Sequence, residues 1–357
     1  MSIPAGRRGP RWRMAMLLVF TAAAMGLALW WGKVALASRE RVFRGKPESE
    51  WIKNLKYWDD PQVAEWRSYG EEGVQVLIRG LQRAYRPRER LYRNCYRPLP
   101  PLLQRFLPNP KQDSTRVRRM CLVSLLASLG TNALSATPVM IWTAREDESD
   151  TVRQGAISYF NSTEDDKSIL NRLPRDQKDA LLPALIRSVQ DPGNWGLRNN
   201  AALSLQWYPE RRDIVAPVLL GALKDPQPQV RLLAAEALNR VAPDIARKAG
   251  ATSVLVAIAK NPDGQIAYRA VAGLGHAGSD PILAVPALVE CLQSTNTLVA
   301  FQAVCVLARP PEDFISYSNT IISGLKSAAE RKDNHAADAR NALKRWIPNP
   351  AAKQEKK

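Results

Sequence analysis

The sequence predicts an all-α protein, an α-solenoid of stacked antiparallel helix pairs preceded by one N-terminal transmembrane helix. From Cys121 onward, a small residue followed four positions later by a large apolar residue recurs at intervals of 33 to 45 residues. Apolar segments, several of which begin with proline, alternate with these pairs. Sustained period-2 alternation, which is typical of half-buried strands, is not found in the sequence, so almost no sheet is expected.

The N-terminal segment 1–38 is interpreted as a basic leader followed by a membrane anchor. Four arginines precede the uncharged run Met14–Gly32, whose 19 residues would span about 28 Å as a helix. Trp30 and Trp31 stand at the end of this run, where indole rings favour the membrane interface. A cleaved signal peptide is the alternative, because Ala35-Leu36-Ala37 offers a cleavage site.

The arginines before the apolar run suggest an orientation for the rest of the chain. Short arginine-rich tails usually stay in the cytoplasm, although basic residues also follow the run closely. We therefore expect a single-pass membrane protein whose body is extracytoplasmic, either periplasmic or extracellular. Residues 39–64 are predicted to form a juxtamembrane lead-in, 65–346 the solenoid, and 347–357 a charged C-terminal tail.

The small and large residues mark the first helix of each repeat. A spacing of i, i+4 places both side chains on one helix face, so each pair is predicted to face the core. Glu236 stands between the members of one pair and is assigned to the outer face of its helix. The pairs are Cys121/Leu125, Ala156/Phe160, Ala201/Leu205, Ala234/Leu238, Ala270/Leu274, Ala303/Leu307 and Ala339/Leu343.

An arginine stands three residues ahead of the small position in the first four of these helices. We expect this arginine to bridge to a carboxylate or a carbonyl of the next repeat rather than to bind a ligand. Dipeptides such as Asp191-Pro192 separate the helices; Asp or Asn can cap the next helix and proline suits its first position. The four arginines are Arg118, Arg153, Arg198 and Arg231.

This pattern resembles that of HEAT repeats. The segment KDPQPQVRLLAAEAL (224–238) carries the Asp-Pro turn, the arginine and the small–large pair together, whereas the repeats after residue 260 lack the arginine. The segment FRGKPESEWIKNL (43–55) also resembles the lead-in of bacterial membrane-anchored HEAT-repeat proteins. The resemblance covers 65–346 and implies a scaffold that binds a protein partner on its surface. Because no helix pair can bury its apolar face alone, such repeats must stack.

Much of the positive charge lies in an insertion, 83–112, that the repeat spacing does not require. Residues 66–120 hold 13 basic and 4 acidic side chains, out of a formal net charge of +17 for the chain. Tyrosines alternate with arginines in the insertion, a composition that suits a polyanion through charge pairing and stacking. Six prolines there oppose a long helix. The possible anionic-ligand contacts are Arg83, Arg86, Arg88, Arg90, Arg93 and Arg97.

Two interpretations of the insertion are open at this point. It is either a solvated loop whose tyrosines pack over one end of the solenoid, or part of a binding site for anionic ligands over 83–119. Lipid headgroups and envelope polyanions are the expected ligands, and nucleic acid is not, because the body is expected outside the cytoplasm. The sequence also leaves open whether Cys95 and Cys121 pair.

The remaining composition argues against catalysis. Four cysteines and two histidines exclude a disulfide-dense scaffold and zinc motifs of the CxxC or HExxH type. No phosphate-binding glycine loop or nucleophile elbow is found, and the Ser, His and Asp within Gly275–Asp280 are too close in sequence for a catalytic triad. The sequence therefore predicts a membrane-anchored, non-enzymatic scaffold for a protein partner, with no catalytic residue, cofactor or metal site.

Overall fold

The computed structural model describes residues 40–57, 59–85, 99–100, 112–164, 167–276, 278–331 and 335–347. The predicted transmembrane helix, with Trp30 and Trp31, lies outside the described residues, as does most of the insertion. The chain divides into two compact units, residues 1–55 and 56–357, which are described separately.

In the first unit the described residues form a small hairpin followed by a helix. Strands β1 (Val42–Phe43) and β2 (Lys46–Pro47) pair antiparallel, and the turn between them places Arg44 and Gly45 at positive φ. Helix α2 (Glu48–Lys53) follows, and the indole Nε1 of Trp51 donates to the Phe43 carbonyl oxygen at 2.9 Å. This hydrogen bond ties the helix back to the hairpin.

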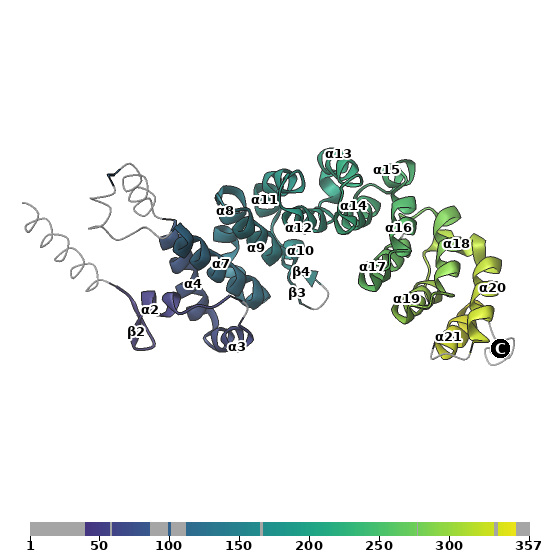
Figure 1. Cartoon of the computed structure of the whole chain (residues 1–357), viewed down its shortest axis with the longest axis horizontal. Helices are drawn as coiled ribbons and strands as arrows, with labels where there is room; N and C mark the ends of the chain where they lie inside the picture. The colour runs from purple at the N-terminus through teal and green to yellow at the C-terminus, as the bar shows by residue number, and fades with distance from the viewer. Residues whose placement is uncertain are drawn as a thin grey trace, which may run out of the picture. The chain divides into compact units, whose positions relative to one another are not determined.

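The second unit is built from antiparallel helix pairs in two layers (Figure 1). The first helices of the pairs are α7 (Gln112–Leu129), α9 (Asp150–Asn161), α12 (Trp195–Leu205), α14 (Pro228–Val241), α17 (Gly264–Leu274), α19 (Thr297–Ala308) and α21 (Ala336–Trp346). The second helices are α4 (Gly70–Ala84), α8 (Thr137–Glu146), α11 (Arg175–Val189), α13 (Arg212–Ala222), α16 (Ala251–Ala259), α18 (Pro281–Cys291) and α20 (Ser318–Ala329).

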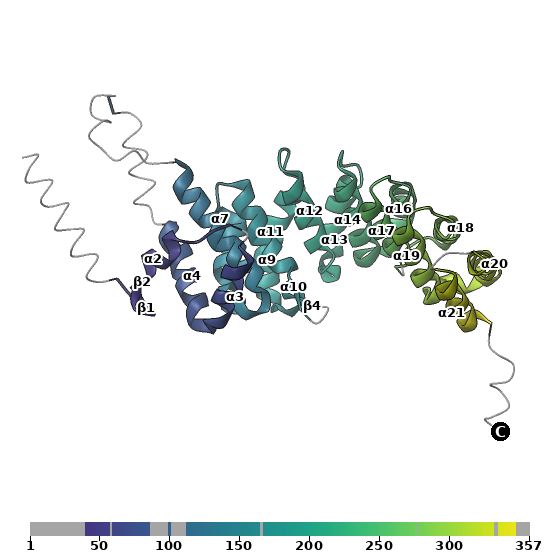
Figure 2. The same cartoon turned by 60° about the horizontal axis from the view of Figure 1, so that its bottom comes forward.

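Shorter elements complete the second unit. Helix α3 (Asp60–Ser68) packs on α4 and α7 at the start of the unit. The others connect the layers: η1 (Gly130–Ala136), β3 (Thr163–Glu164), β4 (Lys167–Ser168), α10 (Ile169–Arg172), η2 (Pro209–Arg211), α15 (Pro243–Lys248) and η3 (Glu312–Tyr317). Each first helix packs against the next first helix, and most second helices do the same, so the two layers run side by side (Figures 1 and 2). The predicted all-α solenoid is thereby confirmed.

The core lies between the two layers, where the repeated pairs were expected. Every member of the seven small–large pairs is buried except Leu343, which is half-buried in the last helix. The small residues allow the helices to approach closely and the large residues fill the space between layers. Leu343 is less covered because no further described helix packs beyond α21.

The turns between repeats differ from the prediction in one respect. The Asp-Pro dipeptides form the turn itself, and the helix caps come two or three residues later. Asp191 Oδ1 accepts hydrogen bonds from the backbone N–H groups of Gly193 and Asn194, and Asn194 then caps α12. The prolines Pro183 and Pro217 also lie inside their helices, because α11 and α13 begin earlier than the prolines indicate.

One described stretch passes a length and composition test for a membrane-crossing helix. Residues Arg116–Glu146 include an 18-residue apolar window, half of which is buried inside the protein. This stretch comprises α7, η1 and α8, and both α7 and α8 pack against α9. Its apolar residues are therefore accounted for by the core of the solenoid.

The junction between α14 and α17 is built differently from the others. Helix α15 is inserted there, and the second helices on its two sides, α13 and α16, barely touch. Asn239 is buried and donates to Ser279 Oγ at 3.3 Å, while its Oδ1 has no hydrogen-bond partner among the described residues. The backbone passes so closely that a Cβ on Gly278 would lie 2.4 Å from the Asn239 carbonyl oxygen. The junction therefore holds a buried asparagine and a buried serine at a close backbone approach.

Glu236 belongs to this junction, and its assignment to an outer face is wrong. Its side chain is only 12% exposed, because α17 packs over that side of α14. Its Oε2 lies 3.4 Å from Arg269 Nη2. Burial raises the pKa of the Glu236 carboxyl, and the nearby charges of Arg269 and Arg240 offset only part of this effect.

We expect Glu236→Gln to raise the free energy of unfolding at neutral pH. The folded pKa of Glu236 lies above its ordinary value of 4.5, so its contribution to stability is fully present below that value and is lost as the pH rises through the folded pKa. The stability gap between variant and wild type should therefore shrink toward acid pH in denaturant titrations. His276 is present in both proteins, so its contribution to the pH dependence cancels when their unfolding free energies are subtracted. A gap that is independent of pH would contradict the assignment.

Candidate functional site

The repeat arginines form a ladder of ion pairs along the edge where each first helix begins. Three aspartates, each in the turn before a first helix, form ion pairs with an arginine on the first helix of the repeat before. The third pair is bidentate, with Arg198 Nε and Nη2 at 2.7 and 3.1 Å from the Asp225 carboxylate. The pairs are Arg119–Asp147, Arg153–Asp191 and Arg198–Asp225.

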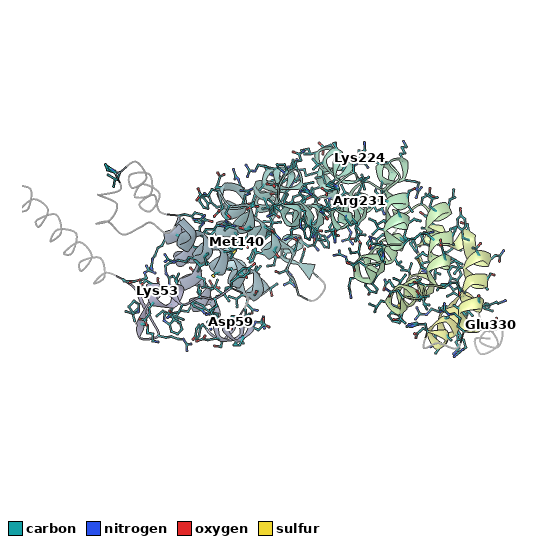
Figure 3. The ribbon with its side chains drawn as sticks, viewed as in Figure 1. Lys53, Asp59, Met140, Lys224, Arg231 and Glu330 are labelled. Carbon is teal, nitrogen blue, oxygen red and sulfur yellow. The ribbon has the colours of Figure 1, made fainter. Side chains whose placement is uncertain are left out.

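The arginine of the following helix holds each turn from its other side. Arg153 Nη1 donates to the Asp147 carbonyl oxygen at 2.9 Å, and Arg198 Nη1 donates to the Asp191 carbonyl oxygen at 3.0 Å. Arg231 Nη1 does the same at Asp225, at 2.7 Å, and Figure 3 shows Arg231 on α14 near Lys224, at the turn that follows α13. The predicted bridge to the next repeat is therefore confirmed for Arg153 and Arg198, whereas the bonds of Arg231 go to the turn that precedes its own helix.

The first arginine of the ladder is one residue away from the predicted one. Arg119, not Arg118, is buried and pairs with Asp147, its Nε lying 2.8 Å from Oδ2. The ladder ends after Asp225, because Asn261 replaces aspartate in the next turn and the later first helices lack the arginine. The arginine ladder is thus confined to the N-terminal half of the described solenoid.

Tyr85, where the insertion begins, is part of this ladder. Its hydroxyl donates to Asp147 Oδ2 at 2.5 Å, and its ring packs against Trp142 and beneath the guanidinium of Arg119. Burial, reinforced by the negative charge of Asp147, raises the pKa of the Tyr85 hydroxyl. This tyrosine packs on the end of the solenoid and is not free to stack on a ligand.

Among the six arginines proposed as anionic-ligand contacts, Arg83 alone is described. It lies half-buried in the last turn of α4. The others, Arg86, Arg88, Arg90, Arg93 and Arg97, lie outside the described residues, as does Cys95. The anionic-ligand site therefore stays a prediction.

A cavity of about 330 Å³ lies on the first-helix layer, between α7 and α9 and beside α12. None of its lining residues carries a formal charge, although the chain as a whole carries +17. Small polar side chains predominate. The lining residues are Tyr57, Met120, Val123, Ser124, Ala127, Ser128, Thr151, Gln154, Gly155, Ser158, Ser162 and Asn200. We call this cavity the serine groove.

The serine groove follows from the small residues on the facing sides of α7 and α9. Gly155 lies directly against α7, where an added Cβ would be 2.9 Å from Val123 Cγ1. The serines at 124, 128, 158 and 162 recur at helical spacing, so they line one stripe on each helix. Short side chains at these positions leave space that larger ones would fill.

Several polar groups in the serine groove have no partner within the described part of the chain. These are the hydroxyls of Ser124, Ser128 and Ser158 and the side-chain amide of Asn200, all half-buried except the exposed Ser128. Gln154 Oε1 accepts from Asn194 Nδ2 at 3.3 Å, which leaves its amide N–H groups available. Two cations flank the groove: Arg116 Nη2 donates to Thr151 Oγ1 at one end, and Arg67 Nη2 to the Ser128 carbonyl oxygen at the other.

The sequence prediction did not include the serine groove. A signal for it was present, since serine, glycine and glutamine occupy the positions of α9 that flank the buried residues. Which helices border that stripe depends on the packing of α7 against α9, which the sequence pattern alone does not provide. Within the described residues, no cluster of three or more His, Cys, Asp or Glu side chains is arranged to hold a metal ion.

Comparisons with known proteins agree with this architecture. A family model described as HEAT repeats matches residues 137–239, which comprise α8 to most of α14. No curated protein matches the sequence of the chain. The matched segment therefore contains HEAT repeats, and the described residues form an all-α HEAT-like solenoid.

Several solved structures are similar in part. A designed armadillo repeat protein is 17% identical, with 59% of this chain and 100% of that chain covered and a TM-score of 0.40. An archaeal HEAT-like repeats protein from Thermococcus onnurineus NA1 is 17% identical, with coverage of 63% and 92% and a TM-score of 0.37. The complex of CpcE and CpcF of phycocyanin lyase from Nostoc sp. PCC7120 is 17% identical, with coverage of 66% and 91% and a TM-score of 0.38.

Proposed function

We propose that this chain is a non-enzymatic scaffold that binds a protein partner through the serine groove. The observation that carries the proposal is a cavity in which the hydroxyls of three serines and the side-chain amide of Asn200 have no partner within the described part of the chain. Half-buried polar groups are stabilised when they are hydrogen-bonded, so a partner that supplies those bonds would be favoured there. The arginine ladder holds α9 and α12 in place beside the groove, which supports preorganised binding.

Site-specific photocrosslinking tests this proposal on the full-length chain. A photoreactive amino acid at Ser128, which is exposed at one end of the groove, should yield a discrete crosslinked protein. The matched control is Ser323, an exposed serine on α20 in the other layer. Adding Ser158→Arg should suppress the product at Ser128, because the arginine would fill the groove. Equal products from both positions, or a product unaffected by Ser158→Arg, would contradict the proposal.

A second candidate function is the binding of anionic ligands by 83–119, supported by the charge of residues 66–120. Replacing Arg86, Arg88, Arg90 and Arg93 with glutamate should then abolish binding to anionic liposomes. Binding by the unmodified chain should weaken steeply with salt, because salt screens exposed charges. The melting temperature should change little, since the insertion lies outside the repeat register. Liposome binding that survives the four substitutions would refute this candidate.

We further propose that residues 14–32 anchor the scaffold in a membrane, with the remainder extracytoplasmic. The length of the uncharged run and the terminal Trp30 and Trp31 support this. The full-length chain should sediment with membranes and resist extraction by high salt. A phosphatase reporter fused after Gly70 should be active. An inactive phosphatase with an active cytoplasmic reporter at the same position would reverse the orientation.

A further inference from the structure

We infer that the serine groove binds an extended, uncharged peptide segment of the partner protein, recognised largely through its main chain. This inference rests on the proposed function and specifies the chemistry of the partner. Three properties of the groove carry it: the absence of charge in its lining, its direction along the helices, and the kind of hydrogen-bonding groups that it presents.

The lining excludes a charged occupant at the centre of the groove. All twelve lining residues are uncharged, and the flanking arginines Arg116 and Arg67 lie at the two ends. Asp150, next to Thr151, places a negative charge at the same end as Arg116, and its carboxylate already accepts from the Thr151 backbone N–H and from Asn194. A charged side chain in the middle would lose hydration without meeting an opposite charge, which is unfavourable.

The direction of the groove suits a chain in extended conformation. Its lining residues run from Met120 to Ser128 on α7 and from Thr151 on α9 to Ser162, the residue that follows this helix. At about 1.5 Å per helical residue, these stretches are roughly 12 and 16 Å long. An extended peptide advances about 3.3 Å per residue, so the groove accommodates roughly four or five residues. The narrow approach at Gly155 favours small side chains on that segment.

The polar groups of the groove match a peptide main chain. Backbone groups within α7 and α9 are already bonded inside the helices, so recognition falls to side chains. The hydroxyls of Ser124 and Ser158 can each donate or accept, the Asn200 amide can do both, and Gln154 contributes N–H donors. An extended chain presents alternating N–H and C=O groups that these side chains can pair with. Met120 and Ala127 supply the apolar surface between them.

Selection from a random peptide library on the full-length chain tests the inference. Enriched peptides should contain a central run of four or five small, uncharged residues. Their binding should change little between about 0.05 and 0.5 M salt, because no ion pair forms in the centre of the groove. Ser158→Arg should abolish binding, while Ser323→Arg, on the other layer, should not affect it.

An isosteric substitution gives a sharper test. Asn200→Asp changes the charge of the groove without changing its size. The enriched peptides should bind this variant about tenfold or more weakly, and a new selection on it should enrich peptides with a central lysine or arginine. Ser124→Ala should weaken binding by only about two- to tenfold, the effect of a single hydrogen bond. Equal melting temperatures of the variants and the wild type would show that folding is unaffected.

The outcomes separate the inference from the function on which it rests. Acidic or basic consensus peptides that bind in a salt-dependent manner and are blocked by Ser158→Arg would overturn the uncharged-segment inference, while protein binding in the groove would stand. The absence of any enriched peptide would overturn the inference as well. Peptides that ignore Ser158→Arg would remove the groove as the binding site. Displacement of the crosslinked partner by neutral oligosaccharides would replace peptide with glycan as the ligand class.

Discussion

Arg198→Ala is expected to lower the free energy of unfolding by about 3 kcal/mol, because it leaves a buried carboxylate unpaired. The Asp225 side chain is 8% exposed and Arg198 is 10% exposed, so neither is well solvated. Arg198 also donates to the Asp191 carbonyl oxygen, so the substitution removes its contacts to two successive turns. Denaturant titration of the full-length chain, followed by circular dichroism, measures the loss.

Arg212→Ala is the matched control for this prediction. Arg212 and Asp244 make the same kind of arginine–aspartate pair, with Nη2 and Oδ2 2.9 Å apart, but both side chains are more than half exposed. Exposed pairs contribute little because water screens them. Little measurable change is therefore expected. A loss as large as that for Arg198→Ala would show that burial does not determine the strength of the ladder.

Leu238→Ala is expected to cost about 2–5 kcal/mol. Leu238 is fully buried on α14, which packs against helices of both layers, so truncation leaves a cavity that the surrounding helices cannot easily fill. Ala234→Leu, one turn earlier, should cost about 1–3 kcal/mol through overpacking. The melting temperature and the denaturation midpoint should both fall.

Leu298→Ala provides the comparison for Leu238→Ala. Leu298 lies in the first turn of α19 and is 46% exposed, so its truncation should change stability by no more than about 0.5 kcal/mol. The two variants remove the same atoms from the same residue type. If they destabilised the chain equally, the assignment of the core face of α14 would be wrong.

The repeat architecture could be predicted from the sequence because one local signal recurs in each repeat. The i, i+4 pairs report directly which helix face is buried, and stacking follows from the inability of one pair to cover itself. Position Glu236 could not be predicted in the same way. The i, i+4 pair identifies one buried face, which describes a helix that is covered from one side only. Helix α14 packs against α12, α13, α15, α16 and α17, so most of its surface is covered, including the side that carries Glu236.

The sequence pattern also could not predict which arginine begins the ladder or where the serine groove lies. Successive helical residues point about 100° apart, so a shift of one residue within Arg118-Arg119 exchanges an outer arginine for the buried partner of Asp147. The serine groove depends on two helices from different repeats. Its residues are visible in the sequence, but their convergence requires the packing of α7 on α9.

The arginine ladder also restricts which insertions and deletions the solenoid can accept without losing an ion pair. Removing Asp191 together with the following helices up to Asp225 would bring Arg153 to Asp225 and restore a pair, whereas an excision that ends mid-repeat would strand a buried charge. We therefore expect duplications and deletions between Arg119 and Asp225 to be tolerated only in whole repeats. Extra residues within that span should accumulate where no pair must be kept. The hairpin β3–β4 and helix α10, which follow the C-terminal end of α9, occupy such a place and lengthen one repeat spacing to 45 residues.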